Sequence, residues 1–206
     1  MSRTILYLIA TILTIAIIGI SIAAWWGGLR GEIDIYDVFP VFGLIAFGLM
    51  WLHYINGSFK RYLGLSGEPA LLRRYFEITS IIVLILILLH PALLYIGLFQ
   101  DGFGLPPGSS MQVYTTTATR IGVVIGLVSL VAFLLFELRH WFRKRSWWPF
   151  IAYVSDGAML LIVIHGLLLG KEMSSWFRII WLLMGVLLIA SLIYNRWYDR
   201  QRVKEA

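Results

Sequence analysis

The chain has 206 residues, of which 60% are hydrophobic and 14% are charged, with a formal net charge of +6 at pH 7. So apolar a composition exceeds what a water-exposed surface tolerates, which excludes an ordinary soluble domain. The chain contains no cysteine, which excludes disulfides, iron–sulfur clusters and covalent attachment of haem through a C-x-x-C-H motif.

The apolar residues form runs of the length that crosses a membrane. A hydrocarbon core of about 30 Å needs about 20 helical residues, and the runs lack the alternation of a transmembrane β-strand. The sequence therefore predicts an all-α, polytopic membrane protein with a six-helix transmembrane bundle. In chain order we expect helices over 4–26, 38–56, 75–98, 119–138, 148–169 and 176–197, in a single transmembrane domain covering 1–206.

The basic residues predict how these helices are oriented, because cytoplasmic loops carry an excess of Lys and Arg. With the N-terminus inside, one side collects 13 of the 17 cations: Arg3, Lys60, Arg61, Arg73, Arg74, Arg139, Arg143, Lys144, Arg145, Arg196, Arg200, Arg202 and Lys204. We therefore expect cytoplasmic N- and C-termini in a plasma membrane of the bacterial type, with connections 57–74 and 139–147 inside. Membrane lipid then accounts for the positive charge, and no nucleic acid is expected as a partner.

The connections 27–37, 99–118 and 170–175 are expected on the outer side. The longest of them, 99–118, is rich in turn-forming residues. Connections of this length are often functional. It is either a cap over a site beneath it or a plain surface loop.

Two of the four histidines, His90 and His165, lie inside strongly apolar runs, where ionisable residues are functional candidates. His90 follows Arg74 by 16 residues and His165 follows Pro149 by 16, so each lies about 24 Å from the cytoplasmic face. Two imidazoles at one level can hold a haem iron from both sides, with Gly166 leaving room for the macrocycle. Alternatively, each histidine only hydrogen-bonds to a neighbouring helix, or the pair binds another metal.

The sequence around each histidine has a recognisable context. Arg73-Arg74 precede a run that ends in Leu89-His90-Pro91-Ala92-Leu93-Leu94-Tyr95, and Trp148 precedes Leu161-Ile162-Val163-Ile164-His165-Gly166-Leu167-Leu168-Leu169-Gly170. These stretches resemble the third and fifth helices of the ferric-reductase-like transmembrane domain family, which includes the MsrQ proteins, the STEAP reductases and the membrane parts of NADPH oxidases. The resemblance covers about residues 38–197.

This resemblance implies b-type haem between the two helices, electron transfer across the membrane, and His90 and His165 as ligands of a haem near the outer face. Two-haem members carry a second histidine about four turns earlier on each helix. Here those positions hold Phe76 or Glu77 and Ala152, so the resemblance implies one haem b. Single-haem STEAP members suggest a flavin or a quinone at the inner side.

The two remaining histidines, His53 and His140, are candidates for a second site that replaces the missing inner pair. The alternatives are a hydrogen bond across helices for His53 and simple interfacial exposure for His140. On the outer side, Arg120, Arg178 and Tyr114 are expected near the haem level. They either hydrogen-bond the haem propionates or anchor helices at the interface.

Two carboxylates, Glu77 and Asp156, are expected within the inner half of the bundle, where a charge needs a partner. They serve either proton uptake or ion pairs with Arg73, Arg74 or another interfacial cation, and the many cations of the inner loops favour the ion pairs. Glu137 near Arg139 is interpreted in the same way.

The leading hypothesis is a ferric-reductase-like cytochrome, an oxidoreductase module without its own NAD(P)H domain, because the sequence contains no nucleotide-binding glycine motif. Electrons would come from a separate cytoplasmic flavoprotein or a quinol, and would reach ferric iron, oxygen or a periplasmic redox partner. No catalytic residue is predicted. The alternative is a non-haem transporter or structural membrane subunit whose histidines line a proton or metal path.

Overall fold

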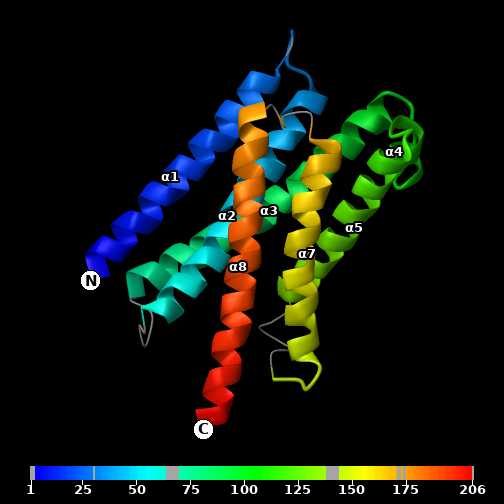
Figure 1. Ribbon diagram of the computed structural model, residues 1–206. Helices are drawn as coiled ribbons and strands as arrows, with labels where there is room; N and C mark the ends of the chain where they lie inside the picture. The colour runs from blue at the N-terminus through cyan, green and yellow to red at the C-terminus, as the bar shows by residue number, and fades with distance from the viewer. Residues whose placement is uncertain are drawn as a thin grey trace. The chain divides into compact units, whose positions relative to one another are not determined.

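The computed structural model of the chain describes residues 3–29, 31–63, 70–137, 144–170, 173 and 175–205. This part of the chain holds seven α-helices and no β-strand, which confirms the predicted all-α class. In chain order (Figure 1) the helices are α1 (Arg3–Gly28), α2 (Ile35–Tyr62), α3 (Ala70–Gln100), α4 (Gly108–Val113), α5 (Thr117–Glu137), α7 (Trp148–Leu169) and α8 (Ser175–Glu205).

Six of these helices, all except α4, are long and apolar enough to cross a membrane. Many of their large apolar side chains point outward: Ile15 is 66% exposed, Val186 62% and Ile193 65%. Lipid is the medium in which such surfaces are stable, since each helix satisfies its own backbone hydrogen bonds and its side chains contact hydrocarbon. The chain is therefore a polytopic helical membrane protein, as predicted.

The helices extend beyond the apolar runs that predict them. Helix α2 begins at Ile35 because Asp34 caps it: the Asp34 carboxylate accepts from the Asp37 N–H at 2.9 Å, and the Asp37 carboxylate accepts in return from the Asp34 N–H at 3.4 Å. At its other end α2 continues to Tyr62, and α8 continues to Glu205. Hydropathy ends where the hydrocarbon ends, whereas backbone hydrogen bonding continues into the polar interface.

Helix α4 has no counterpart among the predicted helices. It lies in the connection 99–118 and has 6 residues, too few for a periodic pattern to be recognised. Its Ser109 and Ser110 are 1% and 0% exposed, and the Ser110 hydroxyl donates to the Pro107 carbonyl at 2.8 Å. The connection 99–118 thus contains a short helix with two buried serines, and its role as a cap over a site stays a prediction.

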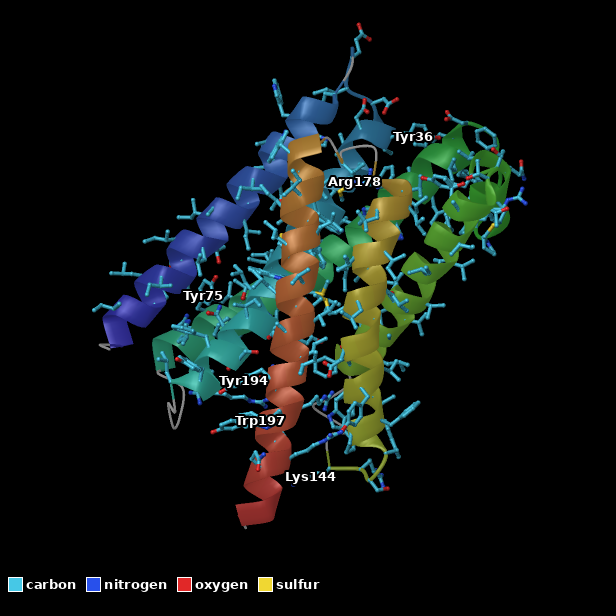
Figure 2. All side chains as sticks on the ribbon, viewed as in Figure 1. Tyr36, Tyr75, Lys144, Arg178, Tyr194 and Trp197 are labelled. Atoms are coloured by element: carbon cyan, nitrogen blue, oxygen red, sulfur yellow. The ribbon has the colours of Figure 1, made fainter. Side chains whose placement is uncertain are left out.

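The chain divides into two compact units, and unit 1 comprises Met1–Leu94 and Val186–Ala206. Within it, the hydroxyl of Tyr75 on α3, a residue labelled in Figure 2, hydrogen-bonds the hydroxyl of Thr14 on α1. The hydroxyls of Ser58 on α2 and Ser191 on α8 are likewise hydrogen-bonded to each other. Hydroxyl pairs of this kind join helices where lipid offers no alternative partner.

Unit 2 comprises Tyr95–Gly185 and contains α4, α5 and α7 with the adjoining ends of α3 and α8. Helix α5 turns the small residues Gly122, Gly126 and Ser129 toward α7, and the Ser129 hydroxyl donates to the Ala158 carbonyl at 3.4 Å. Small residues let two helix backbones approach closely. The expectation that both units form one domain stays a prediction.

Candidate histidine sites

His90 is held in unit 1 by the backbone of a neighbouring helix. Its Nδ1 lies 2.9 Å from the carbonyl oxygen of Phe39 on α2. A carbonyl can only accept, so Nδ1 carries the proton and donates it. In a neutral imidazole the lone pair is then on Nε2, the nitrogen that can ligate a metal. Metal-ligating histidines commonly donate their other ring N–H to a backbone carbonyl in this way.

The neighbouring helix also provides space for the His90 ring. Gly43, one turn after Phe39 on α2, faces the imidazole so closely that a Cβ atom at this position would lie 2.8 Å from Nδ1 and 2.9 Å from Cε1. The ring of Phe39 lies beside the imidazole, with 5.2 Å between ring centroids and 46° between ring planes. The ring of His90 is therefore positioned by a carbonyl, a phenyl ring and a glycine of α2.

His165 is held in the same way in unit 2. Its Nδ1 lies 2.9 Å from the carbonyl oxygen of Gly122 on α5 and donates to it. One turn later on α5, Gly126 faces the ring, and a Cβ there would lie 2.6 Å from Cε1 and 2.7 Å from Nδ1 of His165. Both histidines thus pair with a carbonyl and with the glycine four residues after it.

The helix that carries each histidine is continuous over the distance used to predict its depth. Helix α3 is unbroken from Arg74 to His90, and α7 from Pro149 to His165, so about 24 Å of helix lies below each ring. The accepting carbonyls of Phe39 and Gly122 each belong to the first two turns of their helices. That both rings lie at one level in the membrane stays a prediction.

The residues that hold these rings are absent from the predicted site. A backbone carbonyl has no signature in a sequence, because every residue type carries one. The glycines could have been found only by knowing which face of α2 and α5 meets the histidine. A glycine one turn after an unremarkable residue is too common a pattern to indicate this.

Gly166 has a packing role. A Cβ there would lie 2.5 Å from Cζ2 of Trp181, so the space beside Gly166 is filled by this indole. The indole Nε1 donates to the Val163 carbonyl at 2.9 Å. The room that Gly166 leaves is used to pack α7 against the first part of α8, and a role toward a macrocycle stays a prediction.

Arg120 and Tyr114 lie together beside α4 in unit 2. The Arg120 guanidinium donates through Nε to the Tyr114 carbonyl at 3.0 Å and through Nη2 to the Met111 carbonyl at 3.3 Å. It thereby caps the C-terminal end of α4, where carbonyls lack helical partners. Arg178 is exposed in the first turns of α8 (Figure 2). Pairing of these three residues with propionates stays a prediction.

His53 uses the opposite ring nitrogen. Its Nε2 lies 2.8 Å from the hydroxyl oxygen of Thr79, and that hydroxyl donates to the Tyr75 carbonyl at 3.0 Å. Nε2 of His53 and the Thr79 hydroxyl are therefore hydrogen-bonded to each other between α2 and α3. Phe76, one of the two positions where a second histidine is missing, packs edge-on against His53 with ring centroids 5.1 Å apart. His53 makes the hydrogen bond across helices that was its alternative interpretation, and His140 lies outside the described residues.

The carboxylates are only partly as predicted. Glu77 pairs with Arg73 at 3.9 Å, which confirms the expected ion pair, but both side chains are 66% exposed, so placement of Glu77 within the bundle is wrong. Asp156 is half-buried on α7, and Arg139, the expected partner of Glu137, lies outside the described residues.

Among the described residues, no group of three or more His, Asp or Glu side chains is gathered as a metal site. The two histidine sites are therefore the strongest candidates in this part of the chain. Comparison of the chain with protein-family models, with curated proteins and with solved structures gives no match.

Proposed function

We propose that the chain is a membrane-embedded b-type cytochrome that transfers electrons across or within the membrane, with the iron of one haem held by His90 and His165. The observation that carries this proposal is the donation of Nδ1–H from both imidazoles to backbone carbonyls at 2.9 Å. It fixes both rings in the tautomer whose Nε2 can bind iron. His53 instead uses its Nε2, in a hydrogen bond to the Thr79 hydroxyl across helices.

The residues present fit the requirements of a haem. A haem brings four ring nitrogens of its own and takes only its axial ligands from the protein. Two separate histidines meet this need, whereas a metal with protein ligands alone requires a larger cluster. The rings are set in apolar helices, as a largely apolar macrocycle requires.

When bound, the haem supplies one-electron redox chemistry. The role of the chain's own residues is to hold this group and to orient the two imidazoles. The carbonyls of Phe39 and Gly122 keep a proton on Nδ1 of each histidine, and the surrounding apolar side chains exclude water. Arg120, Arg178 and Tyr114 are proposed to bind the propionates at the outer side through charge-assisted hydrogen bonds.

The donor and acceptor follow from the proposed orientation. With the cation-rich connections in the cytoplasm, both histidines lie nearer the outer face, and a cytoplasmic flavoprotein or a quinol supplies electrons at the inner side, through a flavin or quinone bound there. Ferric iron, oxygen or a periplasmic redox protein accepts them outside. The resemblance of residues 38–197 to ferric-reductase-like domains supports this assignment.

The test is an absorption spectrum of the purified protein, oxidised and dithionite-reduced, with haem quantified as the pyridine haemochrome. We expect Soret and α bands of a low-spin b-type haem and one haem per chain. His90→Ala and His165→Ala should each abolish the low-spin bis-histidine spectrum. His53→Ala is the matched control and should keep it.

Protein that carries no haem after expression with haem supplementation would refute the proposal. It would favour the alternative, a transporter or structural subunit whose histidines line a proton or metal path. Two haems per chain would refute the single-haem assignment instead. Retention of the low-spin spectrum in His90→Ala or His165→Ala would refute that residue's role as a ligand.

A further inference from the structure

We infer that Gly43 and Gly126 are positioning residues for the imidazoles of His90 and His165, an inference that rests on the proposed function. Each glycine lies on the helix that also provides the carbonyl acceptor for the same ring, four residues after that carbonyl. In both units, a helix therefore presents a carbonyl and an adjacent bare backbone surface to one histidine.

The two glycines differ from the other glycines of their surroundings. Gly57 on α2 and Gly157 on α7 have no atom of the described part of the chain within 4 Å of an added Cβ. Gly48 on α2 faces the aliphatic side chain of Ile17. Gly43 and Gly126 each face an imidazole. Since glycine lowers helix stability relative to alanine, its presence here is explained by the ring beside it.

A Cβ at either position cannot be accommodated without moving the ring. The contacts of 2.6 to 2.9 Å with ring atoms lie inside van der Waals distance, and an imidazole is flat and rigid. The ring cannot turn away freely, because its Nδ1–H must still reach the carbonyl at 2.9 Å on the same helix. An alanine therefore forces the ring to rotate or shift, which weakens or breaks this hydrogen bond.

The orientation of the ring and its Nδ1–H bond determine how strongly Nε2 donates to a metal. A histidine that loses this bond is a weaker donor to iron and stabilises the ferric state less. Gly43→Ala and Gly126→Ala should therefore each raise the midpoint potential of the haem and move the largest g value of its low-spin electron paramagnetic resonance spectrum. Gly57→Ala and Gly157→Ala should change neither quantity.

The same inference is tested on haem-free protein by nitrogen-15 spectra of histidine-labelled samples. The signals of His90 and His165 in the wild-type protein can be assigned with His90→Ala and His165→Ala. Both signals should show a protonated Nδ1. Gly43→Ala should shift the His90 signal, and Gly126→Ala the His165 signal, while Gly48→Ala, which crowds Ile17 and no histidine, should shift neither. If wild-type protein binds no haem, the proposed function fails, whereas this experiment still decides the role of the glycines.

A double-mutant cycle covers the case in which an alanine variant folds poorly. Gly43→Ala should lower the thermal stability of the wild-type protein but not that of His90→Ala, where the ring is absent and alanine favours the helix. The pair Gly126→Ala and His165→Ala should behave alike. Equal destabilisation in both backgrounds, unchanged histidine spectra, or the same changes in Gly48→Ala would overturn the inference.

Discussion

At the scale of single residues, the three histidines of the described part of the chain are distinguished by the ring nitrogen that each uses. His90 and His165 donate from Nδ1 to a backbone carbonyl, and His53 is hydrogen-bonded through Nε2 to the hydroxyl of Thr79. The sequence predicts all three as ionisable residues in apolar surroundings. It cannot predict the tautomer, which depends on whether a carbonyl or a hydroxyl of another helix faces the ring.

The contact between His53 and Thr79 leads to a prediction about stability. Thr79→Val should destabilise the protein by about 1 kcal/mol, since it removes the hydroxyl partner of a hydrogen bond across helices. Thr79→Ser keeps the hydroxyl and should be close to wild type. Thr11→Val is a further control, because the Thr11 hydroxyl donates to the Tyr7 carbonyl of its own helix. Unfolding of the detergent-solubilised protein by an added denaturing detergent measures these differences in the free energy of unfolding.

The haem content of the same variants tests the role of His53. If His53 has a structural role, Thr79→Val keeps one haem per chain together with its midpoint potential. Loss of haem in Thr79→Val, with the fold retained by circular dichroism, would contradict that role and revive a second site at His53.

At the scale of helices, the sequence predicts the six spans well, because each needs about 20 apolar residues and little else. The sequence does not predict α4, and it does not predict which faces of neighbouring helices contact each other. The facing of two helices depends on their rotation about their own axes, which is set by small residues and by large side chains that fit against them. Gly166 and Trp181 are such a pair, and neither residue alone indicates the other.

This pair predicts the effect of overpacking between α7 and α8. Gly166→Ala places a methyl group 2.5 Å from the Trp181 indole and should destabilise the protein by about 1–3 kcal/mol. Trp181→Phe removes atoms of the larger ring and should partly relieve Gly166→Ala, although it loses the bond to the Val163 carbonyl. Gly157→Ala, on the same helix with open space beside it, is the matched control. Thermal unfolding in detergent measures the three variants.

If Gly166→Ala is instead as stable as wild type but binds less haem, the space beside Gly166 serves the macrocycle as the sequence predicts. A stable variant with full haem content would show that neither role is important.

At the scale of the whole molecule, the predicted orientation rests on the distribution of cations, and a contact in unit 1 joins two helix ends that the prediction places on the same side. Arg61, at the end of α2, pairs with Asp199 near the end of α8 at 3.3 Å and donates to the Asn195 carbonyl at 3.2 Å. Both helix ends are predicted to be cytoplasmic, as residues in contact must be. A pairing between an inner and an outer end would have contradicted the topology.

The absence of cysteine allows a direct test of this orientation. Single-cysteine variants can be labelled without background, and Lys144 and Thr115, both exposed, stand in connections predicted to lie on opposite sides of the membrane. In intact cells, an impermeant maleimide should label Thr115→Cys and leave Lys144→Cys unlabelled until the membrane is permeabilised. The cation-rich connection stays inside because moving several Lys and Arg residues outward is opposed by the positive-inside bias. Labelling of Lys144→Cys in intact cells, with Thr115→Cys protected, would reverse the orientation and place the two histidines nearer the cytoplasm.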